Sequence, residues 1–586
     1  MKFFKEYAFP LATAFLLCMF LLFLPDLKRC RLRDNNAARK QLTKWDALIM
    51  AVITLVYGTV AFWNLGNRES PQTFVNMEGI GESFCLPDDR EVKTILFFTG
   101  VGIGSYDVEY SFDGEEYFQL TNYEQSHGDD LKWKKIELSV YARGGYIRFT
   151  GHGNVYLGEV VFLDTEGEPI DVVPSRKSLY DETELFAPEE TYMNSSYFDE
   201  IYHARTAWEH LHRIEPYEIT HPPLGKIIIG MGIRLFGMTP FGWRFSGTLF
   251  GTLMLPIMYI FLKKLFGGME IPAAGTIVFA SDFMHFTQTR IATIDSYAVF
   301  FILLMYLFMY QFITEGKKRD LALSGLFFGF GAASKWTCLY AGAGLAVLWL
   351  IWVIRELRSG RLKLRGFLKN VGFCIVFFII VPCVIYYLSY RPYALAKRGM
   401  PLLSGDYLNM VIDNQKYMFN YHSGVDAEHP YSSRWYQWIL DVRPILYYLV
   451  YHDDGTRSAF GAFVNPALCW GGLMCLFVLI APAVFRKDRR AQFILIGYLA
   501  QLVPWMFIDR VVFEYHYFPC TVFLVMAVSY VFELYRLNVR KWRIPIWGFV
   551  ILSVTLFIMF YPAISGRAVR NEVADLVLGW FPTWPF

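Results

Sequence analysis

Apolar runs long enough to cross a lipid bilayer recur along this 586-residue chain and constrain its fold more than any other feature. They lie at about residues 8–24, 45–64, 241–264, 271–288, 294–314, 319–336, 337–355, 369–388, 466–485, 491–508, 515–535 and 544–562. In lipid, helices satisfy their own backbone polar groups, and each needs about 20 residues to span the hydrocarbon. The runs predict a polytopic α-helical membrane protein with about 12 transmembrane helices.

Basic residues gather in every second loop between these runs. They lie at 28–44, 263–264, 317–319, 355–369, 486–490 and 536–543. Lys and Arg are enriched in cytoplasmic loops, so we expect these loops in the cytoplasm. Both termini and the long connections, at about 65–240 and 389–465, are then outside. The first run is followed by Pro25 and charged residues rather than a cleavage site, which predicts a retained span.

The first long connection changes from helical to alternating patterning between about 73 and 164. Residues 106–112 alternate polar and apolar, Asp113-Gly114 predicts a turn, and 133–140, 146–149 and 155–162 continue as short strands. This pattern predicts an inserted extracytoplasmic all-β sandwich. The segments YSFDGEEYFQL, WKKIEL, YIRFTG and VYLGEVVF resemble discoidin-like or carbohydrate-binding jelly rolls. A generic β module is the alternative, and sugar binding does not follow from the fold.

The patterns divide the chain into six segments. They are two N-terminal transmembrane helices with a basic cytoplasmic loop (1–64), the β-sandwich (65–180), a first outer loop with an acidic pair and interfacial helices (181–240), a transmembrane core (241–390), a second outer loop (391–465) and C-terminal transmembrane helices (466–586). In the first outer loop, apolar residues from Ile201 to Leu211 recur at helical spacing and predict an amphipathic helix. Residues 224–236 are apolar but contain Lys226 and Arg234, so we expect them to dip into the outer leaflet without crossing.

Ionisable side chains collect at the outer ends of the predicted spans, where they are energetically expensive and therefore candidates for function. They are Asp199, Glu200, Arg244, Arg290, Asp295, Lys335, Arg510 and His516, with Tyr515 and Tyr517 beside the last. His221, before Pro222-Pro223, is expected to shape the first outer loop rather than to bind a metal. Cations can hold a phosphate, and a carboxylate can take a proton from an attacking hydroxyl. A sugar on a polyprenyl phosphate would supply the activated carbon on a membrane face without nucleotides.

Each of these residues also has a structural interpretation. Asp199 and Glu200 are compatible with a helix N-terminus, and Asp295 with a helix cap or a partner of Arg290. Arg244 and Lys335 are compatible with snorkelling to lipid headgroups. For the histidines His203, His210 and His212, surface or substrate-shaping roles are favoured over a metal site, and no metal ligands are predicted.

Motifs across about 190–525 resemble the protein O-mannosyltransferase family, glycosyltransferase family 39 of the GT-C superfamily. They are YFDEIYHA, HPPLGKIII, GWRFSGTLFG, RIATIDSYAVFF, GAASKWTCLY, HPYSSRWYQWIL and RVVFEYHYFPC, in that order. The resemblance implies a GT-C fold and an inverting transfer of mannose from a polyprenyl phosphate to a protein Ser or Thr hydroxyl. It also implies an active site on the extracytoplasmic face of the cell membrane.

The resemblance also implies a role for each matched residue. Asp199 would be the general base and Glu200 its support. Arg244, Lys335 and Arg510 would bind the donor phosphate, with Asp295 and His221 shaping the donor pocket and His516 among the substrate-binding residues. The implied partners are the lipid-linked donor, a secreted or membrane protein acceptor and membrane lipids. No cofactor is certain and a divalent metal is left open.

Two features depart from the family pattern. There is an extra N-terminal span, and a β module occupies the first outer loop, whereas the second outer loop is too short for the β-trefoil of eukaryotic relatives. Together they point to a bacterial type and leave the acceptor open.

Three alternatives to protein mannosylation remain. One is a GT-C transferase that moves another sugar to a lipid or cell-wall polymer. A transporter should show internal repeats and polar residues at all membrane depths, which the sequence lacks. A glycan sensor would not need the Asp199–Glu200 pair. The net charge of +2 gives no basis for nucleic-acid binding.

Overall fold

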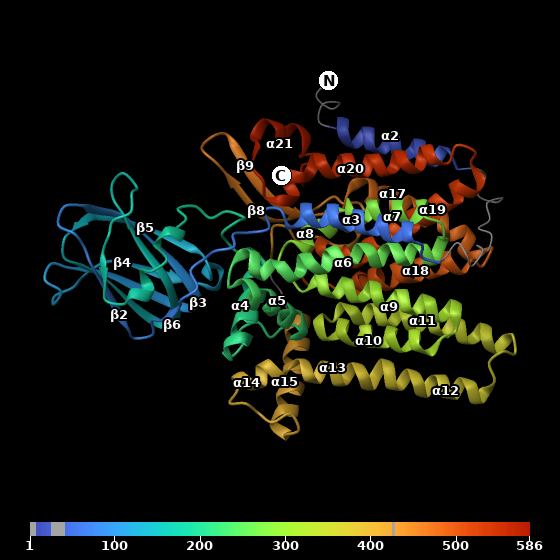
Figure 1. Cartoon of the computed structure of the whole chain (residues 1–586), viewed down its shortest axis with the longest axis horizontal. Coiled ribbons are helices and arrows are strands. Elements are labelled where there is room, and N and C mark those ends of the chain that lie inside the picture. The colour runs from blue at the N-terminus through green and yellow to red at the C-terminus, as the bar shows by residue number, and fades with distance from the viewer. Residues whose placement is uncertain (1–6, 25–40, 425–427) are drawn as a thin grey trace. The chain divides into compact units, whose positions relative to one another are not determined.

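The computed structural model describes residues 7–24, 41–424 and 428–586 of the chain (Figure 1). The chain divides into two compact units. The helical unit consists of Met1–Trp63, Ile219–Ile227 and Gly247–Phe586, and the β unit consists of Asn64–Glu218 and Ile228–Ser246. Each unit is described by itself below.

Eight helical segments of the described chain are long and apolar enough to cross a membrane. They are α3 (Lys44–Phe62), α6 (Pro240–Phe266), α9 (Asp295–Glu315), α11 (Thr337–Arg358), Leu364–Ala396, α17 (Pro466–Val484), Glu514–Asn538 and α20 (Arg543–Ser565). The segment Leu364–Ala396 joins α12 (Leu364–Ile375), a π turn (Val376–Ile380), α13 (Val381–Ser389) and α14 (Arg391–Ala396). The segment Glu514–Asn538 joins η7 (Glu514–Tyr517) and α19 (Phe518–Asn538). The polytopic helical class is confirmed.

The other four predicted spans are helical but shorter. They correspond to α2 (Ala8–Leu22), α7 (Glu270–Ala280) with α8 (Phe283–Thr289), α10 (Lys318–Ser334) and α18 (Arg489–Leu502) with η6 (Val503–Phe507). The 271–288 run is broken because the Asp282 side chain accepts a hydrogen bond from the backbone N–H of His285 and so caps a new helix. The total of about 12 spans therefore stays a prediction.

The helical unit is built around α19, whose residues from Phe518 to Tyr535 are all buried. α7, α17 and α18 pack on it, and α10 lies against α9 and α13 (Figure 1). The second outer loop contains α15 (Gly405–Gly424), α16 (Trp435–Trp438) and two strands that the sequence analysis did not predict. These strands, β8 (Ile445–Tyr451) and β9 (Thr456–Ala462), form a small antiparallel sheet with β10 (Val569–Arg570).

The β unit contains one seven-stranded sheet in which β4, β3, β6, β2 and β7 are successive neighbours. The strands are β1 (Val75–Asn76), β2 (Gly81–Cys85), β3 (Glu91–Ser111), β4 (Phe118–Gln125), β5 (Trp133–Arg143), β6 (Tyr146–Leu163) and β7 (Val173–Pro174). The long strands β3 and β6 pair from Thr94 to Ser111 of β3, and Phe84, Phe97 and Phe162 pack in the core of the sheet. A β-sheet region is confirmed, whereas the sandwich and the discoidin likeness stay predictions.

Two predicted strands, 146–149 and 155–162, are one continuous strand, β6. The sequence Gly151-His152-Gly153 continues the strand between them. A close approach of the two backbones requires glycine at Gly102 of β3, which has φ of 129°: an added Cβ there would lie 1.9 Å from the Asn154 carbonyl oxygen of β6. The register between β3 and β6 shifts next to this point, between Thr99 and Gly102, as in a β-bulge.

Two further helices follow the sheet along the chain. α4 (Asp199–His212) has the predicted apolar face, with Ile201, Ala204 and Ala207 buried. α5 (Leu224–Phe236) has the predicted bounds, and its first turns, to Ile227, belong to the helical unit.

Candidate functional site

The predicted site residues divide between the two units. Asp199, Glu200 and Arg244 belong to the β unit, and His221, Asp295, Lys335, Arg510 and His516 belong to the helical unit.

The start of α4 has an unusual backbone. Phe198, which precedes the helix, has φ of 49° and ψ of −137°, a region that residues with a side chain rarely adopt. Asp199 is the first helical residue and is half-buried, whereas the next residue, Glu200, is fully buried. Strained backbone of this kind gathers at functional sites, where the surrounding structure must hold it in place.

Glu200 and Arg244 form a two-pronged buried ion pair. The Arg244 Nε and Nη2 atoms lie 2.9 and 2.8 Å from the two carboxylate oxygens of Glu200, and neither side chain is exposed. The remaining N–H groups of Arg244 donate to the carbonyl oxygens of Leu65 (3.0 Å), Tyr192 (2.6 Å) and Ser195 (2.7 Å). All five donors of the guanidinium are thus used by protein atoms, which leaves none for a phosphate.

The next turns of α4 are fixed by a second buried network. The Arg205 guanidinium donates to Asp130, at the end of the β4–β5 connection, and to Glu209, at 2.7 Å each. Glu209 accepts the backbone N–H of Tyr217, also at 2.7 Å. The predicted helix histidines have structural neighbours here: His203 Nδ1 lies 3.8 Å from a Glu218 oxygen and His212 Nδ1 lies 2.9 Å from the Trp208 carbonyl. The network fixes the orientation of the helix that begins at Asp199.

In the helical unit, Asp295 and Lys335 form a mostly buried ion pair. Asp295 begins α9, Lys335 follows α10, and Lys335 Nζ lies 2.7 Å from Asp295 Oδ1. The ammonium group also lies 5.3 Å from the centre of the Tyr515 ring. Arg290, the other partner considered for Asp295, donates instead to the carbonyls of Ala61 and Trp63, at 3.0 Å each.

Four predicted residues line one cavity of about 230 Å³ in the helical unit, and we call this cavity the cationic pocket. They are His221, Lys335, Arg510 and His516. Trp336, Tyr340, His422 and Trp505 also line the cationic pocket and were not identified from the sequence. Arg510 is half-buried and has no carboxylate within ion-pair distance in the described part of the chain. Its guanidinium is therefore available to an anion.

α15 holds the loop that carries His221 in this pocket. His422 Nε2 lies 2.8 Å from the Thr220 carbonyl, Asn414 donates to the Ile219 carbonyl at 3.0 Å, and the rings of His221 and His422 are 5.1 Å apart. Burial, together with nearby His221 and Arg510, lowers the pKa of His422 to about 4. His422 is therefore neutral at pH 7 and contributes no charge. No sequence motif marked it, because it lies in a helix with ordinary polar composition.

A second cavity, of about 820 Å³, shares Arg510 with the cationic pocket. It is lined by residues of the HPYSSRW motif, including His429, Ser433 and Arg434, and by Arg443. Arg434 lies 3.7 Å from Asp509 and Arg443 donates to the Pro430 carbonyl at 2.7 Å. Arg510 thus separates a small aromatic and cationic pocket from a wider polar one.

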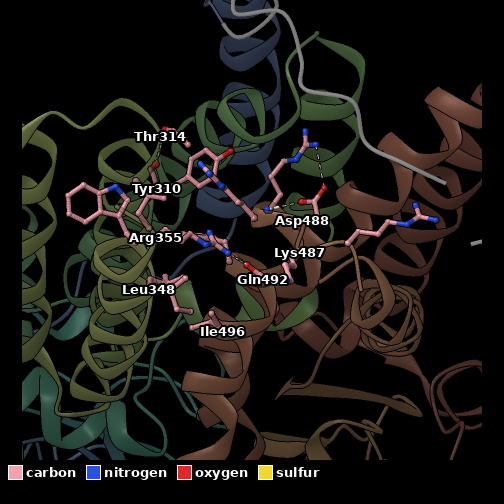
Figure 2. A pocket seen from close by; sticks show the side chains of 15 residues that line it. Tyr310, Thr314, Leu348, Arg355, Lys487, Asp488, Gln492 and Ile496 are labelled. Carbon is pink, nitrogen blue, oxygen red and sulfur yellow. Dashed lines mark hydrogen bonds and ion pairs between the residues drawn. The ribbon is translucent and has the colours of Figure 1, made fainter. Parts of the chain in front are cut away.

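A third cavity, of about 510 Å³, lies at the other, basic ends of the helices and contains none of the predicted site residues (Figure 2). It is lined by Arg355, Lys487, Arg489 and Arg490, with Asp488 as the acidic member. Arg355 donates to Gln492, and Asp488 caps α18 by accepting from the backbone N–H of Arg490. These residues belong to the loops predicted to face the cytoplasm.

Comparison with known proteins gives consistent matches. The family model described as dolichyl-phosphate-mannose-protein mannosyltransferase matches residues 220–386. The model of the C-terminal four-TMM region of protein O-mannosyltransferase matches residues 407–584.

Individual relatives match over most of their own length. The polyprenol-phosphate-mannose–protein mannosyltransferase of Mycolicibacterium smegmatis is 24% identical over 66% of this chain and 87% of the relative. Its counterpart from Mycobacterium tuberculosis is also 24% identical, over 66% and 86%. The solved S. cerevisiae protein O-mannosyltransferase Pmt1-Pmt2 complex has a similar fold, with a TM-score of 0.59 at 13% identity over 67% of this chain and 89% of that one.

Proposed function

This chain belongs to the protein O-mannosyltransferase family, and we propose that it transfers mannose from a polyprenyl phosphate to Ser or Thr hydroxyls of proteins. It is a multi-pass membrane mannosyltransferase. The observation that carries the proposal is the cationic pocket, because it gathers four of the residues implied by the family motifs and lies within the segments that the family models match.

The cationic pocket is suited to the phosphate of the donor. Arg510 supplies a positive charge without a carboxylate partner among the described residues, Lys335 supplies an ammonium group that is paired with Asp295, and His221 and His516 supply ring nitrogens. A guanidinium and a phosphate can form two parallel hydrogen bonds, which fixes the leaving group as well as binding it. Trp336, Tyr340 and Trp505 supply flat apolar surface beside the charges. We assign this pocket to the phosphate and the sugar attached to it.

Asp199 is assigned as the general base. An acceptor hydroxyl oxygen attacks the anomeric carbon, the bond from that carbon to the phosphate oxygen breaks, and the phosphate leaves with the electron pair. Asp199 takes the hydroxyl proton. One displacement inverts the configuration at the anomeric carbon. The half-buried carboxylate on a strained backbone supports this role.

Glu200 and Arg244 are assigned a positioning role. The family resemblance implied that Arg244 binds the donor phosphate, but its five donors go to Glu200 and three carbonyl groups. The pair therefore holds the segment that ends at Phe198 against the start of α6 and fixes where Asp199 lies. We propose that reaction occurs on the extracytoplasmic side, as the basic loops predict.

A transfer assay tests this function against its alternatives. Full-length protein in detergent is given polyprenyl-phosphate mannose labelled in the sugar, together with a Ser/Thr-rich secreted protein or glycolipid. We expect label in the protein that is released by β-elimination, and none from a nucleotide-linked mannose. Label found only in the lipid or a wall polymer would show that the acceptor is not a protein and would support the alternative transferase.

Replacing Arg510 by glutamine should raise the donor KM about 10-fold or more, because a hydrogen bond to a charged group contributes about 1.5–3 kcal/mol. Steady-state kinetics with varied donor concentration measures this effect. Arg510→Lys should recover part of the affinity, since it keeps the charge but not the paired geometry. Lys416→Gln, at an exposed position of α15, is the control. An unchanged donor KM in Arg510→Gln would remove Arg510 from the phosphate site.

A further inference from the structure

A carboxylate is buried without a partner in the β unit, outside the candidate site. Glu159 lies on β6 and has no exposed surface. Neither of its carboxylate oxygens has a hydrogen-bond partner in the described part of the chain. A buried ionised carboxylate without compensation is very costly, so such a group either binds a proton or faces a cation.

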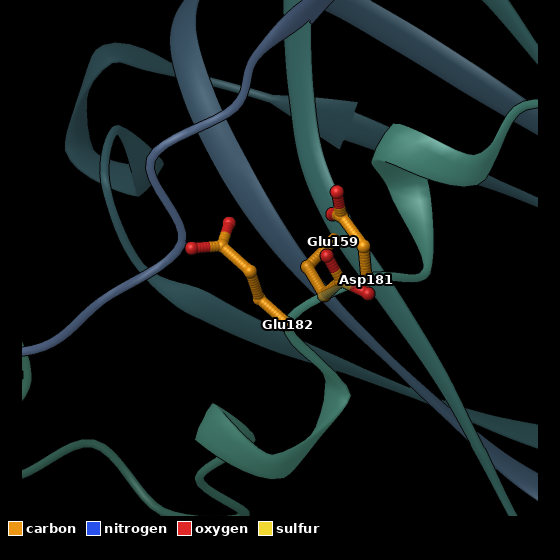
Figure 3. A group of neighbouring side chains, drawn as sticks. All are labelled: Glu159, Asp181 and Glu182. Carbon is orange, nitrogen blue, oxygen red and sulfur yellow. The ribbon is translucent and has the colours of Figure 1, made fainter.

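Two more carboxylates stand beside it (Figure 3). Asp181 and Glu182 lie between η3 (Lys177–Leu179) and η4 (Thr183–Leu185), which both pack on β6. One oxygen from each of the three carboxylates lies within 4.8 Å of the others. Like charges at this distance repel, and no Lys or Arg forms an ion pair with any of the three among the described residues.

The position of Glu159 on its strand is unusual. Val160 and Phe162 point into the core of the module, so the alternation of a strand puts Glu159 on the other face of β6. That face is covered by the segment that carries η4. Asp181 is exposed and Glu182 is half-buried, so solvent reaches the group from the side of Asp181. The group is therefore a largely buried acidic site that a cation can enter from solvent.

We propose that Glu159, Asp181 and Glu182 bind a divalent cation, for which calcium is the best fit. Calcium takes oxygen ligands at about 2.3–2.6 Å, so two of its ligands on opposite sides are roughly 5 Å apart, close to the spread of these oxygens. Magnesium requires about 2.0–2.1 Å and a stricter geometry. Water through the exposed side would complete the coordination of calcium.

A cation bound at this site would link strand β6 to neighbouring segments of the β unit. Glu182 also accepts the backbone N–H of Gln72 at 2.9 Å, and the Gln72 side chain bonds the backbone of Met238 through both its amide oxygen (2.7 Å) and its nitrogen (3.3 Å). A cation bound by Glu182 would therefore also stabilise the segment that leads into α6. This role is independent of the proposed mannosyl transfer.

Calcium binding can be measured on the full-length protein in detergent after chelator treatment. Equilibrium dialysis with radioactive calcium should give one ion per chain, and the thermal midpoint should rise with calcium more than with magnesium at equal ionic strength. Asp181→Asn should weaken binding about 10-fold or more, because calcium affinity depends on the number of charged ligands. Glu137→Gln, exposed on β5 and paired with Lys135, is the control. Absence of calcium binding, or unchanged binding in Asp181→Asn, would overturn the site.

The variant Glu159→Gln gives a second measurement. Glutamine keeps the shape of the side chain but removes its charge, so calcium should no longer raise the thermal midpoint of this variant. A calcium response that persists in Glu159→Gln contradicts the proposal even if the enzyme is inactive.

Discussion

Replacing Asp199 by asparagine should lower the turnover number for mannose transfer about 10²–10⁴-fold, the usual contribution of a general base. Asparagine has nearly the same shape but cannot take the proton from the acceptor hydroxyl. The donor KM should change little, because donor binding is assigned to the cationic pocket. Steady-state kinetics with a saturating acceptor, and donor binding measured without acceptor, separate the two effects.

The control for this variant is Asp171→Asn, an exposed carboxylate of the same unit. A folded Asp199→Asn protein should keep the thermal midpoint of the parent, since the side chain is only half-buried at the first position of α4. Equal turnover in Asp199→Asn and the parent would remove the general base from the mechanism. A parallel loss in donor affinity would instead assign Asp199 to donor binding.

The helices could be predicted largely from the sequence, because their apolar runs and breaks are local. The bounds of α5 were predicted correctly from its apolar stretch. The division of 271–288 into α7 and α8 was missed because it depends on one cap, Asp282, within an apolar run. The strands β8 and β9 were not predicted although they pair with each other locally; β9 also pairs with β10, more than a hundred residues further along the chain.

The motifs pointed to residues that the structure brings together in one cavity, but they did not reveal the partners of those residues. Motifs identified Lys335, Arg510, His221 and His516, and the cationic pocket contains all four. The assignment of Arg244 depended on its charge, but its actual partners, Glu200 and the carbonyls of a distant loop, follow from packing that no local pattern encodes. The sequence did not indicate His422 for the same reason. His422 reaches the pocket only through the packing of α15, which places its ring beside the Thr220 carbonyl.

Removing either partner of the ion pair of Glu200 and Arg244 should be among the most destabilising single substitutions in the β unit. Removing one partner of a buried pair leaves the other charge without compensation and costs about 3–5 kcal/mol. Glu200→Ala should therefore lower the thermal midpoint strongly. Arg244→Met should lower it further, because the carbonyls of Leu65, Tyr192 and Ser195 also lose their donor.

The matched control is the pair of Arg148 and Glu109, which has the same two-pronged chemistry in the same unit, at 2.8 and 3.1 Å, but is partly exposed. Glu109→Ala should cost only about 0.2–1 kcal/mol, as exposed ion pairs do. The double variant Glu200→Ala with Arg244→Met should be less destabilised than the sum of the single variants, since the unpaired charge is then absent. Thermal midpoints of all the variants, measured in one detergent, test this order. Equal small shifts for Glu200→Ala and Glu109→Ala would show that water reaches Arg244 when its partner is removed, and the positioning role of the pair would then have to be abandoned.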